Sequence, residues 1–182
     1  MGNARSRCFS CGTTLGFFEL VPIFSFLFQK GTCRHCGSRI SWQYPMVEFI
    51  TGLVFLLVAG NILQNFQFPI SIESIFKLLY FLTLFSLLIA ISVYDFRHKI
   101  IPNQLVYAFI LFSLFGFLAI GHGDLFENFY SHIVSGFSAF LFFASLWFVS
   151  RGKWMGFGDA KLALGMGFLL GPWLTVLAVI LS

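Results

Sequence analysis

Asp95 and Asp159 are the two residues of this chain whose type and setting best suit chemistry. Each carboxylate lies at the end of a long apolar run, in a sequence where only 10% of the residues are charged and 58% are hydrophobic. A carboxylate at the edge of a hydrocarbon layer costs free energy, so it is expected to have a function. Two carboxylates that share a proton can cleave a peptide bond, as in aspartic proteases. The pair predicts a two-aspartate peptidase, provided that the fold brings both residues together.

Each aspartate also has a simpler interpretation. Asp95 can pair with a basic side chain at the membrane interface, and Asp159 can cap the helix that follows it. Gly156 and Gly158 stand directly before Asp159, and glycine permits a close approach of the backbone. Two carboxylates at one depth, one of them beside these glycines, favour the catalytic interpretation.

Four cysteines near the N-terminus form two matched C-x2-C-G patterns, which we call the cysteine hooks: Cys8, Cys11, Cys33 and Cys36. Four thiolates in two such pairs are typical of tetrahedral zinc. Protein ligands fill all four positions, so the zinc is expected to be structural. Two disulfides are the alternative, which a reducing cytoplasm disfavours.

The composition predicts an integral membrane protein. The mean hydropathy is +0.89, and 27 of the 182 residues are Phe. A membrane-spanning helix needs about 20 apolar residues, and five runs are expected to span: 46–64, 75–94, 103–120, 131–149 and 160–182. A soluble protein could not cover so many apolar helices with its remaining polar surface.

The expected fold is therefore an all-α polytopic membrane protein with about five transmembrane helices. Residues 1–45 hold all four cysteines and are expected to form a small cytoplasmic domain at the membrane face. Residues 46–182 are expected to form the transmembrane peptidase domain.

The basic residues predict which side of the membrane each end faces. If the helices alternate in direction, ten of the eleven Lys and Arg residues lie on one side, and Lys77 is the exception. The positive-inside rule makes that side cytoplasmic, and it places Asp95 and Asp159 together there. The similar sequence from Gly121 to Asp124 falls on the opposite side, roughly 30 Å away, and is interpreted as a turn.

The motifs together resemble the prepilin peptidase family, also called type IV leader peptidases, which are membrane aspartic proteases of the G-x-G-D kind. The cysteine hooks match the family's zinc-binding cytoplasmic loop. Residues 39–48 match its R-I-S…Y-P-x-V-E entry to a helix. Residues 95–103 match the first catalytic motif and residues 156–162 match the second.

The resemblance implies an aspartic endopeptidase with Asp95 and Asp159 as catalytic residues. Gly156, Gly158 and Lys161 are expected to support the active site. The implied substrates are type IV prepilins and type II secretion pseudopilins, cleaved at the cytoplasmic face of the bacterial inner membrane. No nucleic-acid partner is expected.

The resemblance also implies a second activity, and it implies that family members are usually longer than this sequence. Many members methylate the new N-terminus with S-adenosylmethionine, and Glu48 is the position expected to be linked to this step. A charge paired with a nearby arginine is the alternative for Glu48. Gly165 and Gly167 are better interpreted as helix-packing residues than as a nucleotide loop. Family members usually extend beyond both ends of this sequence, so the chain is expected to be shortened.

A membrane transporter or channel is the competing function. In that case Asp95 and Asp159 would relay protons, and such acids are expected near the middle of the membrane. The position of both aspartates at one face favours the peptidase.

Overall fold

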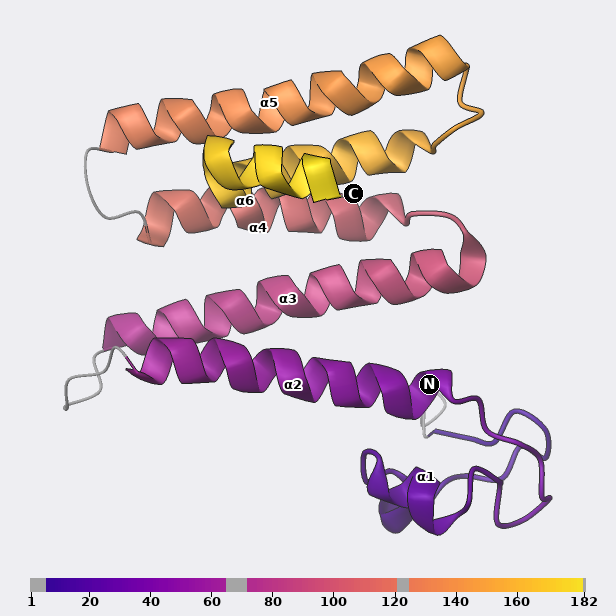
Figure 1. Cartoon of the computed structure of the whole chain (residues 1–182). Coiled ribbons are helices and arrows are strands. Elements are labelled where there is room, and N and C mark those ends of the chain that lie inside the picture. Colours follow the sequence, from indigo (N-terminus) through magenta and orange to yellow (C-terminus); the bar gives the residue numbers. More distant parts are fainter. Residues whose placement is uncertain (1–5, 65–71, 121–124, 182) are drawn as a thin grey trace, which may run out of the picture. The chain divides into compact units, whose positions relative to one another are not determined.

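The protein is almost entirely helical in this computed structural model, which describes residues 6–64, 72–120 and 125–181. Figure 1 shows the elements in chain order: the 3-10 helix η1 (Phe17–Glu19), α1 (Phe24–Phe28), α2 (Gln43–Gln64), α3 (Ile72–His98), α4 (Asn103–Ile120), α5 (Leu125–Ser150) and α6 (Phe157–Leu181). Within those described ranges the only extended pairings are two isolated bridges. The predicted all-α class is confirmed.

Four helices are long and apolar enough to cross a membrane: α2 over Gln43–Ile62, α3 over Ile72–His98, α5 over Phe129–Ser150 and α6 over Phe157–Leu181. The described apolar part of α4 is shorter, Asn103–Gly116. Five spans were expected, and the difference is α4. The chain is a multi-pass helical membrane protein.

The chain forms two compact units, Met1–Leu57 and Val58–Ser182. The first contains the cysteine hooks, η1, α1 and most of α2. The second contains α3 to α6. The expected border at residue 45 lies close to the start of α2 at Gln43, whereas the compact units divide inside that helix.

The core of the second unit lies between α3, α4 and α6. Leu84 and Ile91 of α3 and Val106 and Phe109 of α4 are buried, and Leu162, Met166 and Leu169 of α6 pack against them. This packing fixes the start of α6 relative to the end of α3.

Small residues let α6 approach its two neighbours, α4 and α5 (Figure 1). A Cβ atom at Gly165 would lie 2.7 Å from the ring of Phe109, and one at Gly167 would overlap the backbone of Gly136 in α5. Both glycines are therefore packing residues, as the sequence indicated.

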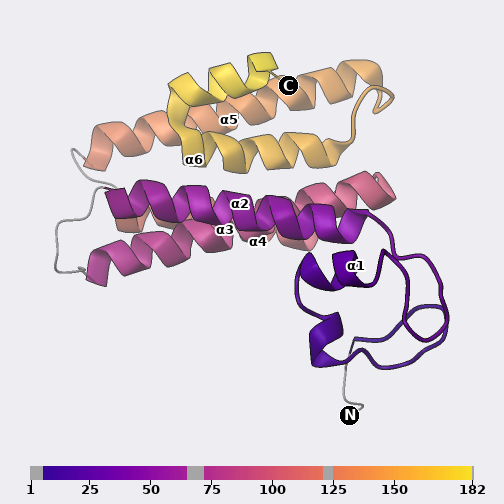
Figure 2. The ribbon, with the colours of Figure 1, turned by 60° about the horizontal axis from the view of Figure 1, so that its bottom comes forward.

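Helix α6 is broken at Gly171, which has φ 72° and ψ 178°. The part that follows turns back instead of continuing in line (Figure 2). Pro172 has no N–H, so it cannot donate to the carbonyl of Phe168 four residues earlier. Nδ1 of His132 on α5 lies 2.8 Å from that carbonyl oxygen and donates to it instead. The expected spanning run over 160–182 corresponds to α6, and Gly171 and Pro172 interrupt this helix.

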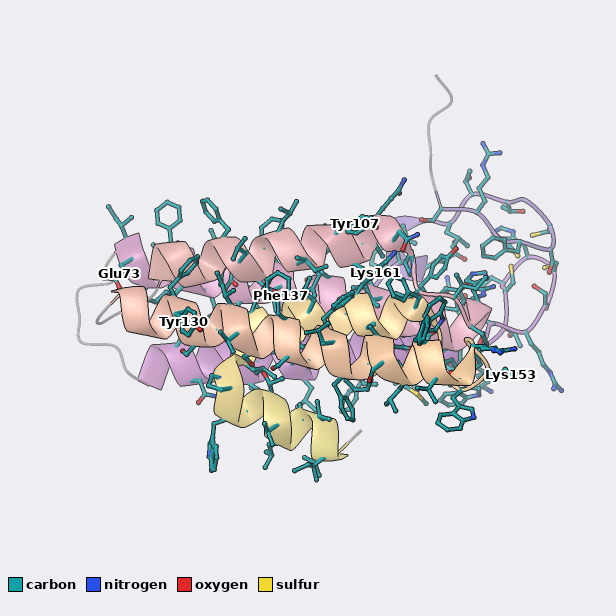
Figure 3. All side chains as sticks on the ribbon, turned by 90° about the horizontal axis from the view of Figure 1, so that it is seen from above. Glu73, Tyr107, Tyr130, Phe137, Lys153 and Lys161 are labelled. Carbon is teal, nitrogen blue, oxygen red and sulfur yellow. The ribbon has the colours of Figure 1, made fainter. Side chains whose placement is uncertain are left out.

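The end of α3 and the start of α6 lie at the same end of the second unit. Lys99 has φ 55° and closes α3, and Arg151 and Gly152, with φ 51° and 73°, close α5. The turns after α3 and α5 therefore return the chain at the same end (Figures 1 and 2). Figure 3 shows Lys153 at this end and Glu73 at the opposite one.

Candidate active site and metal centre

Asp95 lies in the last turn of α3 and is half-buried. The N–H of Lys99 donates to the main-chain oxygen of Asp95 at 2.7 Å, which ends the helix. Within the part of the chain that the structure describes, no ion pair joins Asp95 to Arg97 or Lys99. The ammonium of Lys99 instead lies 5.4 Å from the centre of the Phe96 ring. The described residues therefore give no support to the interpretation of Asp95 as one half of an interfacial ion pair.

Asp159 is the third residue of α6 and is also half-buried. Its Oδ2 accepts a hydrogen bond of 3.1 Å from the N–H of Gly156, and its own N–H donates to the carbonyl of Gly156 at 3.2 Å. A carboxylate that reaches back to the residue before the helix is one half of a capping box. The local fold thus fixes the orientation of the Asp159 carboxylate at the start of α6.

The structure brings the two aspartates to one end of the second unit. Asp95 lies in the last turn of α3, and Asp159 lies in the first turn of α6. The third acidic candidate, Asp124, lies outside the described residues.

The two glycines before Asp159 have different surroundings. A Cβ atom at Gly158 would lie 2.8 Å from Cβ of Ile101, in the turn between α3 and α4, whereas one at Gly156 would have 3.7 Å to its nearest neighbour, Asp159 itself. Gly158 therefore allows α6 to approach the turn after Asp95, and Gly156 supplies an N–H that other residues also have.

Lys161 connects the start of α6 to the start of α4. Its ammonium donates to Oδ1 of Asn103 at 2.9 Å and to the hydroxyl of Tyr107 at 3.3 Å. It also lies 5.3 Å from the ring centres of Tyr107 and Phe157. Figure 3 shows Lys161 and Tyr107 lying close together. Sequence reasoning did not foresee Tyr107, and its spacing four residues after Asn103, one helical turn, is the signal that could have found it.

The two cysteine hooks fold into nearly identical turns. In the first, the N–H of Cys8 donates to the carbonyl of Thr13 and the N–H of Gly12 donates to Cys8, each at 2.9 Å. In the second, Cys33 bonds to Ser38 and Gly37 bonds to Cys33, again at 2.9 Å. Gly12 and Gly37 have φ +70° and +69°. The glycine after each pair is therefore required by the backbone conformation of the turn.

The hooks bring their four sulfur atoms together. All four lie within 4.8 Å of one another, and Sγ of Cys8 lies 3.8 Å from Sγ of Cys36. A tetrahedral ion with metal–sulfur bonds of about 2.3 Å separates its ligands by about 3.8 Å. All four cysteines are free thiols. The cluster can bind a metal ion, and its size fits the predicted zinc.

The hook backbone favours the ionised form of two thiols. The N–H groups of Cys11 and Ser10, with the hydroxyl of Ser38, lower the pKa of Cys8 to about 6. The hydroxyl and then the N–H of Ser38 also lower the pKa of Cys36. Thiolates are the form that binds metal, so the lowered pKa of these two thiols favours metal binding by the hooks.

Glu48 holds part of the N-terminal unit in place. Its Oε2 accepts a hydrogen bond of 2.7 Å from the N–H of Ile23. Ile23 has φ 62°, a conformation that costs a β-branched residue about 1–3 kcal/mol. The sequence suggested either a methylation-linked residue or a charge paired with an arginine, and it did not foresee this contact.

Two family models match the chain. The one described as "Bacterial Peptidase A24 N-terminal domain" covers residues 1–62, and the one described as "Type IV leader peptidase family" covers residues 82–182. The chain belongs to the type IV leader peptidase family. The predicted resemblance is confirmed, and both aspartate motifs lie within the second match.

Curated relatives of this family member are similar in sequence to the chain over most of the chain's length. The prepilin leader peptidase/N-methyltransferase of Bacillus subtilis is 38% identical over 167 residues, which cover 92% of this chain and 61% of the relative. Proteins with the same name from Myxococcus xanthus and Vibrio cholerae are 32% and 31% identical, with 50% and 68% of their lengths covered. The chain thus spans about half to two thirds of these relatives. No solved structure matches it.

Proposed function

We propose that this chain contains the active site of an aspartic endopeptidase that removes leader peptides from prepilins and pseudopilins. The observation that carries the proposal is the position of Asp95, in the last turn of α3, and Asp159, in the first turn of α6, at one end of the second unit. Family membership supports the reaction class, and the curated relatives are named for prepilin processing.

The proposed mechanism uses one ionised and one protonated aspartate. The ionised carboxylate takes a proton from a water molecule, and the oxygen of that water attacks the peptide carbonyl carbon. The protonated carboxyl group donates a hydrogen bond to the carbonyl oxygen. The C–N bond then breaks, and the proton passes to the leaving amine.

The proposed site faces the cytoplasm of a bacterial inner membrane. The positive-inside rule supports this orientation, since Lys153 and Lys161 lie toward the end that carries both aspartates (Figure 3). Lys77, the exception to the charge pattern, forms an ion pair of 2.6 Å with Glu73. That partner lowers the cost of a positive charge on the opposite side.

Zinc is the metal we propose for Cys8, Cys11, Cys33 and Cys36. The sulfur spacing, the lowered pKa of the Cys8 and Cys36 thiols and the absence of disulfides among these four residues support it. An ion held by four protein ligands has no open position for water or substrate. Its contribution is to hold the two hooks together, and both aspartates act without it.

N-methylation of the new N-terminus is a second proposed activity, supported by the names of the relatives. The described residues do not fit S-adenosylmethionine at the positions that sequence offered. The ring of Phe109 occupies the space beside Gly165, and the backbone of Gly136 occupies the space beside Gly167. The Glu48 carboxylate accepts a hydrogen bond from the main-chain N–H of Ile23. We therefore assign no residue to the methyl donor. Incorporation of a labelled methyl group into cleaved prepilin would test this activity.

Cleavage of a prepilin in membranes that contain the protein tests the main proposal. Asp95→Asn and Asp159→Asn should each abolish cleavage, and Asp124→Asn should leave most of it. Full cleavage by either of the first two variants would overturn the proposed site. The transporter alternative predicts proton flux that both substitutions stop, and the relatives give it no support.

A further inference from the structure

Residues 17–28, which we call the aromatic segment, expose an unusual amount of apolar surface. The side chains of Phe17, Phe18, Phe24, Leu27 and Phe28 are 81%, 77%, 62%, 59% and 79% exposed. Neighbouring apolar side chains that are exposed together mark a surface that binds another apolar phase. The segment has only the short helices η1 and α1, so it is too short to cross a membrane.

One aromatic residue of the segment points the other way. Phe26 is buried, its ring packs against Trp42 with ring centres 4.8 Å apart, and it lies against the backbone of Gly31. The segment is thus anchored through Phe26 with its other aromatic side chains directed outward. This two-sided arrangement is that of an amphipathic interfacial element.

The hydrogen bond from Ile23 to Glu48 determines the depth of the segment. Glu48 lies five residues after Gln43, where the membrane-spanning stretch of α2 begins. At about 1.5 Å per residue, that is about 7.5 Å along the helix. Interfacial helices bury their apolar faces about 5–10 Å into the boundary between headgroups and acyl chains. The segment therefore lies at the depth of this boundary.

The charges around the segment complement a phospholipid surface. The exposed side chains of the described part of this unit include Arg7, Lys30, Arg34 and Arg39. Its two acids, Glu19 and Glu48, accept hydrogen bonds of 2.8 and 2.7 Å from the main-chain N–H groups of Gly16 and Ile23. Basic side chains near a membrane are attracted to anionic lipids.

We propose that the aromatic segment inserts into the lipid headgroup layer beside the first turns of α2, and that Glu48 holds it at this depth. The occupant of this apolar surface is the bilayer itself. The first unit is then attached to the membrane twice, by α2 and by the segment, and the metal-binding hooks stand at the lipid surface. The proposal depends on α2 crossing the membrane and does not depend on peptidase activity.

Fluorescence quenching in nanodiscs tests the insertion. Dansylalanine would replace Phe17, Phe24 or Phe28, one at a time, in the full chain in discs that contain anionic lipid. Phe9, which is 94% exposed within the first cysteine hook, is the matched control. Lipids brominated on the upper acyl chain should quench the three segment positions strongly, and aqueous iodide should quench position 9. Iodide quenching at the segment as strong as at position 9 would overturn the proposal.

Substitution of Glu48 tests what sets the depth. Glu48→Gln keeps an acceptor oxygen for the N–H of Ile23, and Glu48→Leu removes it. Lipid quenching at position 24 should persist in the first variant and should fall in the second, with a gain in iodide quenching. Equal quenching in both variants would show that Glu48 does not hold the segment. Cysteine-bound metal, measured in each sample, checks that the unit is folded.

Discussion

Gly158 in the first turn of α6 lies against Ile101 in the turn after α3, so that a Cβ atom added at Gly158 would be 2.8 Å from Cβ of Ile101. The contact joins the turn that follows Asp95 to the residue just before Asp159. Real Cβ atoms essentially never lie this close. The side chain of Ile101 cannot rotate away, because its Cβ is attached directly to the backbone. The two catalytic candidates are therefore held in position by a residue that has no side chain.

Gly158→Ala is expected to move α6 away from the turn and to reduce cleavage strongly. Overpacking of this kind costs about 1–3 kcal/mol of stability, and a displacement of about 1 Å can reduce the rate roughly 100-fold. Gly156→Ala is the matched control, because an added Cβ there has 3.7 Å of space and the N–H to Asp159 remains. Prepilin cleavage rates and thermal unfolding of both variants provide the measurement. Equal losses would show that the contact has no special role.

Lys161→Met is expected to reduce the cleavage rate roughly 10- to 100-fold by loosening the start of α6 from the start of α4. The ammonium donates to Asn103 and Tyr107, and a thioether cannot donate to either. Lys161→Arg should restore part of the rate, since it keeps the charge and the donors. Lys153→Met, at the same end of the unit (Figure 3), is the control and should retain activity. Wild-type activity in the Lys161→Met variant would contradict the positioning role.

The candidate site residues could be selected from the sequence because spacing and apolar periodicity are local properties. The hooks, the membrane helices and the two aspartate motifs each follow from short-range patterns. The placement of Asp95 and Asp159 at the same end of the helices was predicted by assuming that successive helices alternate in direction. That prediction requires only the number of spans between the two residues.

Contacts between distant residues were not readable in the same way. Nothing near Glu48 indicates that its carboxylate bonds to Ile23, 25 residues earlier. The hydropathy of 160–182 is continuous, so it predicted a spanning run without the break inside it, although Gly171-Pro172 is a visible signal for a break. Which glycine allows a close approach depends on the facing residue, and Gly156 and Gly158 look equivalent until Ile101 is located.

The metal-free hook region is expected to gain stability as pH rises from about 6 to about 9. The N–H groups of Cys11 and Ser10 and the Ser38 hydroxyl lower the pKa of Cys8 from 9.0 to about 6. A group whose pKa is lowered by folding stabilises fully above its unfolded value and loses this effect as pH falls through its folded value. Cys33 does not oppose this gain in stability between about pH 6 and about pH 9. The N–H groups of Cys36 and His35 favour its thiolate, but burial and neighbouring thiols raise its pKa above 9.0.

Limited proteolysis of the chelator-treated full chain at several pH values measures this effect. Resistance of the hook region should rise between pH 6 and pH 9. Cys8→Ser should make the profile shallower, because the hydroxyl does not titrate in this range, whereas Cys36, whose pKa is also lowered, keeps part of the dependence. A profile that is equally steep in Cys8→Ser would assign the dependence to another group. Added zinc should protect the wild-type region at pH 7, since metal binding to the hooks stabilises the folded form.

His132→Leu is expected to destabilise the second unit at the break in α6. The carbonyl of Phe168 has lost its helical donor because residue 172 is proline, and Nδ1 of His132 replaces that donor at 2.8 Å. Without it, a polar oxygen faces hydrocarbon, where an unsatisfied group costs several kcal/mol. His132→Asn keeps an N–H donor on a shorter side chain and should lose less. Thermal unfolding in nanodiscs measures both variants, and Ser145→Ala, an exposed position on the same helix, is the control. If His132→Leu unfolds at the same temperature as wild type, water or lipid headgroups satisfy the carbonyl and the histidine does not stabilise the break.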